Sequence, residues 1–351
     1  MALSIPDALE TLRDFSARIG ADPLLTQAAG GNTSLKNGDT LWIKASGTWL
    51  AHARERDIMV PVRTAPLIAA VERGEPQAEQ AEIFTIAEGN PSGLRPSIET
   101  TVHALVPQRV VAHVHCVDTI ALAIRDDAEA VLGEKLAGLN WAFVPYRRPG
   151  LPLAMEIAEH RGQRPDVLVL GNHGLVVTGD TVADAEALLT RVKAMLRQDA
   201  RPAREADLSG LLERAGSHYR LPADAESHAV ATDARNLAIA AGGSLYPDHV
   251  VFLGVGSVVA RDGEDAAAVA TRAPSAPMMI LFPGLGVLMR QDATAGADAM
   301  ARCLADVTRR VAADAPVHYL SEAENHELLN WDAEKYRQSL AKAAAAADAP
   351  Q

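Results

Sequence analysis

A short apolar run that ends in two histidines constrains this chain more than any other stretch. Residues 109–115 carry His113 and His115 after three apolar residues. Side chains of a β-strand alternate between its two faces, so these imidazoles are expected on one face, with Val114 on the other. Two imidazoles on one face are well placed to hold one metal ion. The pair alone is also typical of two half-buried polar side chains in a sheet.

His173 changes that balance. It lies in the turn Gly171-Asn172-His173-Gly174, directly after the run 166–170, which is apolar from Val167 onward and predicts a buried strand. Turns that follow such strands often present functional groups. Three neutral imidazoles that leave one coordination position open form the catalytic zinc arrangement. We therefore expect His113, His115 and His173 to hold one divalent metal, with Zn²⁺ favoured.

Glu99 stands near the start of a helix predicted over residues 98–105, and His103 shares its face. Two roles stay open for this carboxylate. It is either a first-turn acid that complements the helix dipole, which the residues alone favour, or a general acid/base beside a metal. His103 is expected to support Glu99 or the metal pocket rather than to be a fourth ligand.

Two glycine-rich turns complete the set of candidate features. Residues 30–34 contain Gly31 and Asn32, and short strands are predicted on both sides of this turn; residues 46–48 contain Ser46 and Gly47. Backbone N–H groups and small hydroxyls in such turns can bind phosphate. Each is equally consistent with an ordinary tight turn.

Composition narrows the classes of protein that need to be considered. The chain has 351 residues, 48% of them hydrophobic, with a formal net charge of −12 and no Lys/Arg run. A nucleic-acid or anionic-membrane partner is therefore not expected. The chain has two cysteines, so a disulfide framework is not expected. It has no signal-peptide pattern and no apolar run of membrane-spanning length, and we therefore expect a cytoplasmic protein.

The chain is expected to contain two domains. We expect a catalytic domain over 1–205, a charged linker region over 206–234, and a smaller α/β domain over 235–351. In the smaller domain the pattern predicts strands at 250–253 and 278–282, a helix over 295–312 and a last helix over 322–342.

The order of these motifs resembles the class II aldolase/adducin family, over residues 8–200. The motifs that carry the resemblance are Gly31-Asn32-Thr33-Ser34, Lys44-Ala45-Ser46-Gly47, Pro96-Ser97-Ile98-Glu99 with His103, His113-Val114-His115 and Asn172-His173-Gly174. Within the family the chain is most similar to the aldolase part of bifunctional rhamnulose-1-phosphate aldolase/alcohol dehydrogenase proteins. No complete GxGxxG occurs, so we expect the dehydrogenase domain and dinucleotide chemistry to be absent.

The resemblance implies a fold, a reaction and a set of site residues. The fold is an α/β/α sandwich around a central, mainly antiparallel sheet. The reaction is retro-aldol cleavage of a ketose, expected to be a ketose-1-phosphate, through a metal-stabilised enediolate. The implied roles are metal ligand for His113, His115 and His173, acid/base for Glu99, and substrate or phosphate binding for Gly31, Asn32, Ser46, Gly47 and Ser97. A homo-oligomer, with a tetramer favoured, and a sugar or sugar-phosphate substrate are also implied.

Three alternatives stay open. Epimerases and decarboxylases would use the same scaffold and metal, and an adducin-like binding module would use the fold without catalysis. The family often has two small hydroxyl residues before the glutamate, whereas here Ile98 follows Ser97. An unphosphorylated or carboxylate substrate is thus also consistent with the sequence.

Overall fold

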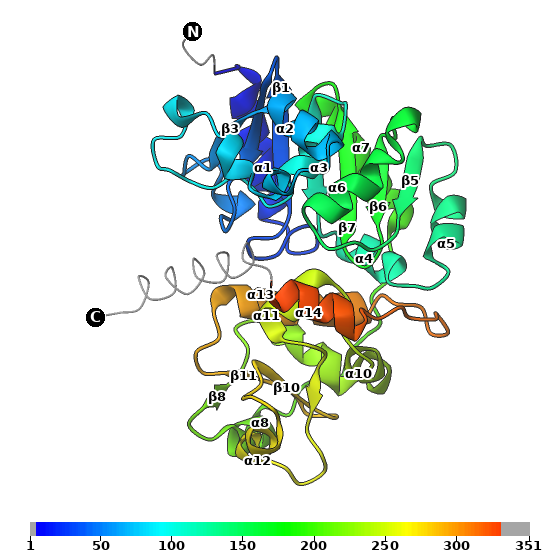
Figure 1. Ribbon diagram of the computed structural model, residues 1–351. Helices are drawn as coiled ribbons and strands as arrows, with labels where there is room; N and C mark the ends of the chain where they lie inside the picture. The colour runs from blue at the N-terminus through cyan, green and yellow to red at the C-terminus, as the bar shows by residue number, and fades with distance from the viewer. Residues whose placement is uncertain (1–4, 331–351) are drawn as a thin grey trace. The chain divides into compact units, whose positions relative to one another are not determined.

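The structure, a computed structural model, describes residues 5–330. The chain forms two compact units. Unit 1 covers the described residues up to Thr119 together with Glu129–Arg197, and unit 2 covers Ile120–Ala128 and the described residues from Gln198 onward. Each is a mixed α/β unit with its own sheet (Figure 1).

Unit 1 is built on a seven-stranded sheet with strand order β3-β2-β1-β4-β7-β6-β5. Only the β5–β6 pair is parallel among these neighbours, so the sheet is mainly antiparallel, as expected. The strands are β1 (Asn32–Asn37), β2 (Thr40–Lys44), β3 (Met59–Arg63), β4 (Val110–Val114), β5 (Trp141–Val144), β6 (Val167–Leu170) and β7 (Gly174–Gly179).

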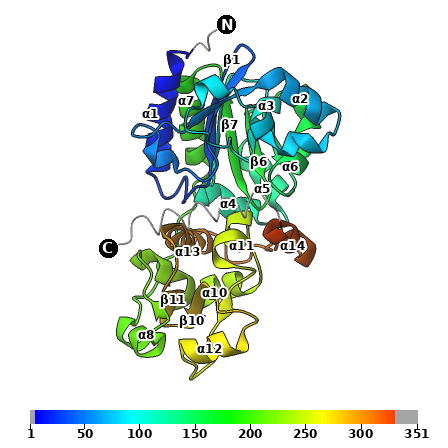
Figure 2. The ribbon, with the colours of Figure 1, turned by 60° about the vertical axis from the view of Figure 1, so that its left-hand side comes forward.

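Helices cover both faces of this sheet, which gives the predicted sandwich (Figure 2). One face carries α1 and α7, and the other carries α2, α3 and α6 over a large apolar core. The helices are α1 (Ala8–Gly20), α2 (Thr64–Glu72), α3 (Thr100–Leu105), α4 (Val117–Ala123), α5 (Ala128–Lys135), α6 (Leu151–Ala158) and α7 (Val182–Leu196). Helix α4 runs from unit 1 into the segment that belongs to unit 2.

Unit 2 has a four-stranded sheet with order β8-β11-β10-β9, in which only the β10–β9 pair is parallel. An apolar core that includes Leu211, Val269, Ile280 and Leu288 packs against it. Its elements are α8 (Leu208–Ala215), β8 (Tyr219–Arg220), α9 (Ala229–Thr232), α10 (Ala234–Ala241), α11 (Pro247–Leu253), β9 (Val258–Val259), α12 (Ala266–Arg272), β10 (Met279–Phe282), β11 (Gly286–Arg290), α13 (Ala295–Thr308) and α14 (Glu322–Asn330).

Two expected strands are wrong. Residues 250–253 end helix α11, which begins with Pro247 in the first helical turn. A short buried apolar run suits a strand or a helix, and proline at this position favours the helix. Residues 26–29, before the Gly-Gly turn, consist of irregular backbone and a turn at 28–29 instead of a strand, with Ala28 at φ 50°. The last predicted helix is described as α14, and residues beyond 330 lie outside the described part of the chain.

Candidate metal centre

His113 and His115 meet at the end of β4. His113 is on the strand, opposite Asn32 of β1 and Val176 of β7, and His115 directly follows Val114, the last strand residue. The Nδ1 of His113 lies 3.1 Å from the Leu175 carbonyl oxygen, which fixes Nδ1 as the donor in the neutral ring. Its Nε2 is 3.2 Å from Nε2 of His115.

The turn between β6 and β7 brings His173 to the same point. Asn172 adopts φ 50°, and Gly174 follows where an added Cβ would lie 2.6 Å from the Val114 carbonyl oxygen. Glycine therefore allows this turn to approach β4 closely. As a result the ring centroid of His173 is 4.8 Å from that of His113 and 5.2 Å from that of His115.

The three imidazoles fit a metal ion. One ligand atom from each lies within 4.8 Å of the others, and the three side chains are 1–7% exposed. Bonds of about 2.0–2.1 Å in a tetrahedron place two ligand nitrogens about 3.3 Å apart, close to the observed separation of the His113 and His115 Nε2 atoms. Within residues 5–330, this is the one group of three or more His, Cys, Asp or Glu side chains whose ligand atoms lie close enough to share a metal ion.

Glu99 faces these histidines rather than its own helix. It is the N-cap residue of α3, yet its side chain makes no capping hydrogen bond. Its Oε2 lies 3.5 Å from His113 Nε2, and its Oε1 lies 3.6 Å from His173 Nε2. Oε1 is buried and has no hydrogen-bond partner among residues 5–330. A buried carboxylate oxygen in that situation suits contact with a cation or with substrate.

The environment of Glu99 favours the carboxylate form. Burial of the carboxyl group has the largest influence on its pKa and raises it. Positive charge at the three histidine positions and a 2.8 Å hydrogen bond from Asn32 Nδ2 outweigh burial, and together they bring the pKa to about 2. The group is therefore arranged to accept a proton rather than to carry one at rest.

Asn32 and Ser97 adjoin the carboxylate. Asn32 Nδ2 also approaches Ser97 Oγ at 3.1 Å, and the Glu99 backbone N–H donates to the same oxygen at 3.2 Å. Both side chains are buried. Two predicted substrate-binding residues are thus part of one hydrogen-bonded group with Glu99.

The other predicted substrate residues lie in tight turns. Gly31 has φ 64°, and an added Cβ there would meet the His113 carbonyl oxygen at 2.9 Å, so close approach to β4 also requires glycine. Ser46 is buried, its N–H donates to the Arg95 carbonyl, and Gly47 has φ 74°. The backbone N–H of Ser46 is therefore already used within the fold.

His103 is fully buried one turn after Glu99. Its Nδ1 lies 2.7 Å from Ser34 Oγ, and its backbone N–H donates to the Glu99 carbonyl. Burial lowers the pKa of this imidazole to about 3, so the ring is neutral at ordinary pH. It links α3 to β1 and is not one of the three clustered histidines.

Sequence reasoning missed how Ser34, Lys36 and Lys44 connect these segments, and it assigned Asn32 to substrate binding alone. Lys44 at the end of β2 is 2% exposed, although it follows three apolar strand residues and reads as an ordinary strand end. Asn32, Ser34 and Lys36 form a row on one face of β1, and all three bind α3 or the residues around it. Their period of two was the available signal.

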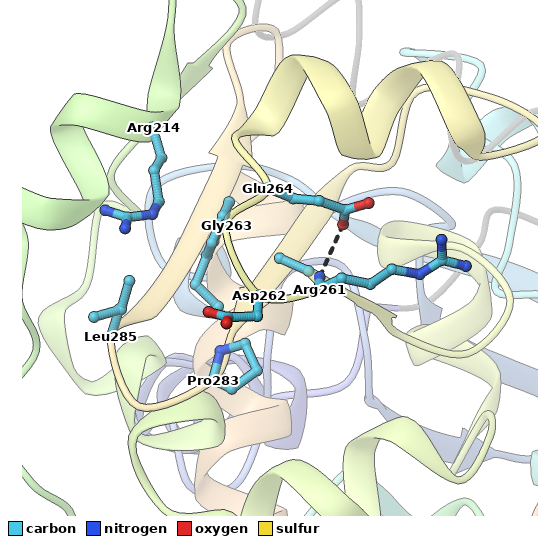
Figure 3. Close-up of a pocket in the computed structure, with 9 residues that line it drawn as sticks. Arg214, Arg261, Asp262, Gly263, Glu264, Pro283 and Leu285 are labelled. Carbon is cyan, nitrogen blue, oxygen red and sulfur yellow. Dashed lines mark hydrogen bonds between the residues drawn. The ribbon is translucent and has the colours of Figure 1, made fainter.

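Unit 2 contains a separate hollow, shown in Figure 3. Its lining includes Arg214, Arg261, Asp262, Glu264, Pro283 and Leu285. The Glu264 carboxylate pairs with Arg272 and accepts the Arg261 N–H, and these bonds lower its pKa to about 2. Arg214 donates to the Gly210 carbonyl. Two of the lining charges, those of Glu264 and Arg214, are thus engaged in contacts within unit 2, and the three histidines belong to unit 1.

Within residues 5–330, none of the helices has the length and apolar character that crossing a bilayer requires.

Comparisons with known proteins identify the family. The family model for the Class II Aldolase and Adducin N-terminal domain matches residues 16–199, more than half of the chain. The uncharacterized oxidoreductase YuxG of Bacillus subtilis is 29% identical over 192 residues, which cover 51% of this chain and 28% of that protein. The chain therefore spans under a third of that relative's length.

Two further proteins are similar to part of this chain. The L-fuculose phosphate aldolase of Methanocaldococcus jannaschii is 26% identical over 165 residues, 45% of this chain and 76% of that protein. The solved N-terminal class II aldolase domain of a Thermoplasma acidophilum protein is 27% identical, with a TM-score of 0.47, and the match covers 56% of this chain and 97% of that domain. With the match of the family model over residues 16–199, the chain belongs to the class II aldolase and adducin family.

Proposed function

We propose that this chain is a metal-dependent aldehyde-lyase that cleaves a ketose-1-phosphate by a retro-aldol reaction. The observation that carries the proposal is the convergence of His113, His115 and His173 on the buried carboxylate of Glu99. The name of the Methanocaldococcus relative, an L-fuculose phosphate aldolase, supports a phosphorylated ketose as the substrate.

The three histidines would hold one divalent ion, for which we propose Zn²⁺. Three neutral imidazoles suit zinc and leave a coordination position for substrate. When bound, such an ion acts as a Lewis acid that stabilises negative charge on substrate oxygens as the carbon–carbon bond breaks.

The chain's own residues would then bind, orient and move protons. Glu99 would transfer a proton through the carboxylate oxygens that face the histidines, and Asn32 would hold that carboxylate in place. Ser97 and Ser46, with the Gly31 and Gly47 turns, would bind the phosphate. Burial of the site would keep bulk water from the reacting atoms.

Further parts of the proposal concern the whole protein. We propose residues 1–205 as the catalytic domain, 206–234 as a linker region and 235–351 as a smaller domain. We also propose a homo-oligomer, with a tetramer favoured, in the cytoplasm. Size-exclusion chromatography with light scattering tests the oligomer.

The decisive experiment combines a metal assay with a substrate screen. Purified protein should contain about one divalent ion per chain. The metal-loaded protein should release dihydroxyacetone phosphate from at least one ketose-1-phosphate in a coupled assay. Chelation should abolish release, and added Zn²⁺ should restore it. Absence of a stoichiometric ion overturns the proposal. If the metal-loaded protein only epimerises or decarboxylates the substrates tested, the proposed retro-aldol reaction is wrong and the proposed metal site still stands.

A further inference from the structure

Lys44 occupies an unusual place for a lysine. It is the last residue of β2 and is 2% exposed. Its ammonium group donates to the Ala29 carbonyl oxygen at 2.8 Å and to the Thr48 carbonyl oxygen at 2.7 Å. Its own carbonyl accepts the Ser97 backbone N–H at 3.0 Å. A buried charge requires good hydrogen bonds, so these acceptors are part of why the lysine can be buried.

These three contacts reach three segments that carry candidate site residues. Ala29 lies in the turn before Gly31 and Asn32, Thr48 lies just after Ser46 and Gly47, and the third segment contains Ser97. The segments are far apart in sequence. Lys44 makes a hydrogen bond to each of the three, two from its side chain and one from its backbone.

The turn beside Ala29 needs such support. Ala28 has φ 50°, a left-handed conformation that is costly for a residue with a Cβ atom, and it is buried. Strained backbone of this kind persists only where its surroundings fix it. A charged donor on the next carbonyl is a direct means of fixing it.

We propose that Lys44 is a positioning residue that holds the turn of residues 26–31 and the turn of residues 45–49 in a fixed relation to Ser97 and Glu99. It acts through these backbone segments and does not itself touch substrate. That these turns bind substrate rests on the proposed function. That Lys44 fixes the geometry of the turns is independent of the proposed function.

Lys36 provides a matched control. It lies on the neighbouring strand β1, and its ammonium group also donates to two backbone carbonyls, those of Val106 and Gln108. Those acceptors follow the C-terminal end of α3, and neither belongs to the two turns. Lys36→Met therefore removes a comparable pair of hydrogen bonds without releasing the turns.

The test compares Lys44→Met with Lys36→Met by hydrogen exchange of the metal-loaded protein. The reporters are the amides of Gly30 and Ser46, which donate to the carbonyls of Gln27 and Arg95. In Lys44→Met their exchange should accelerate about ten-fold or more, as loss of a charged hydrogen bond implies. In Lys36→Met it should stay as in the wild type. Metal content should remain stoichiometric in both.

Kinetics and a second variant complete the test. Lys44→Met should raise KM for a cleaved ketose phosphate more than it lowers kcat, and Lys44→Arg should restore part of the protection. Unchanged exchange in Lys44→Met overturns the proposal. If Lys44→Met and Lys44→Arg both fail to fold while Lys36→Met folds, the proposal is also overturned, since Lys44 then serves the fold. If the wild type cleaves no ketose phosphate, the proposed function fails and the exchange comparison still decides the role of Lys44.

Discussion

Asn32 donates its side-chain amide to Glu99 Oε2 at 2.8 Å, across 67 residues of sequence. The first residue of β1 therefore holds the carboxylate that faces the three histidines. Because the bond stabilises the ionised form of Glu99, it lowers the pKa of that group. The position of Asn32 thus helps to keep Glu99 negatively charged beside the three histidines.

Replacement of Asn32 by aspartate should make that charge sensitive to pH. Asn32→Asp has nearly the same shape but places a second carboxylate against Glu99, and one of two adjacent carboxylates takes a strongly raised pKa. The acidic limb of the pH profile of kcat/KM should therefore move to higher pH than in the wild type. Asn37→Asp, at the other end of β1, is the control. An acidic limb that coincides with that of the wild type would contradict this arrangement.

Removal of one clustered imidazole should remove the metal. In His115→Ala two imidazoles remain, and the ion loses one of its three proposed protein ligands. We expect metal content after dialysis to fall from about one per chain to a small fraction of that, and activity to fall with it. Inductively coupled plasma mass spectrometry measures the metal. His52→Ala, at a partly exposed histidine that pairs with Glu55, should keep both.

Glu99→Gln should separate metal binding from turnover. The amide keeps the shape of the side chain but cannot transfer a proton as the carboxylate does. We expect a full metal complement and a kcat about 10²–10⁴-fold lower, the range for a lost general acid/base. A variant with wild-type kcat would exclude Glu99 as the acid/base. Loss of metal in this variant would instead assign the carboxylate to metal binding.

Local patterns predicted the parts of the fold that local physics determines. The alternation of β4 placed His113 and His115 together, and the Gly-Asn-His-Gly turn after an apolar strand indicated His173. The helix α11 was missed because four apolar residues suit either structure, and the deciding signal was Pro247 before them.

Long-range contacts could not be predicted in the same way. The burial of Lys44 depends on the carbonyl oxygen of Ala29, which approaches it only when the turn before β1 is folded. The orientation of Glu99 depends on Asn32 in the same manner, and the helix-dipole role was otherwise the simpler interpretation. Both contacts join segments that are distant in sequence and meet only in the folded unit, which a local residue pattern does not contain.

The capping box of α7 offers a stability prediction. Thr181 Oγ1 accepts the Asp184 N–H, and Asp184 Oδ2 accepts the Thr181 N–H. Thr181→Ala should lower the free energy of unfolding of unit 1 by about 1 kcal/mol. Urea unfolding followed by tryptophan fluorescence measures it. Thr190→Ala, in the middle of the same helix, should lower the free energy of unfolding by less than Thr181→Ala does. Equal decreases in the two variants would argue against a stabilising cap.

A last prediction concerns His249 of unit 2 and the effect of acid. Its Nδ1 accepts the Leu245 N–H at 3.3 Å, and its Nε2 lies 3.1 Å from the Gly256 carbonyl oxygen, so the buried ring is held neutral. Burial lowers its pKa to about 4 from 6.5, and the Gly256 bond opposes this only in part. Between these two values the unfolded chain binds a proton that the folded unit does not. The free energy of unfolding should therefore fall as pH decreases from 6.5 to 4, by up to about 3 kcal/mol.

His249→Gln tests the source of that pH dependence. Glutamine does not titrate, so the variant should be less stable at pH 7 yet lose less stability on acidification. Hydrogen exchange of α13 amides, measured across the pH range and corrected for intrinsic rates, reports on unit 2. His326→Gln, at an exposed histidine of α14, should keep the wild-type slope. Equal slopes for His249→Gln and the wild type would show that other groups cause the acid sensitivity, because only the titration of His249 differs between them.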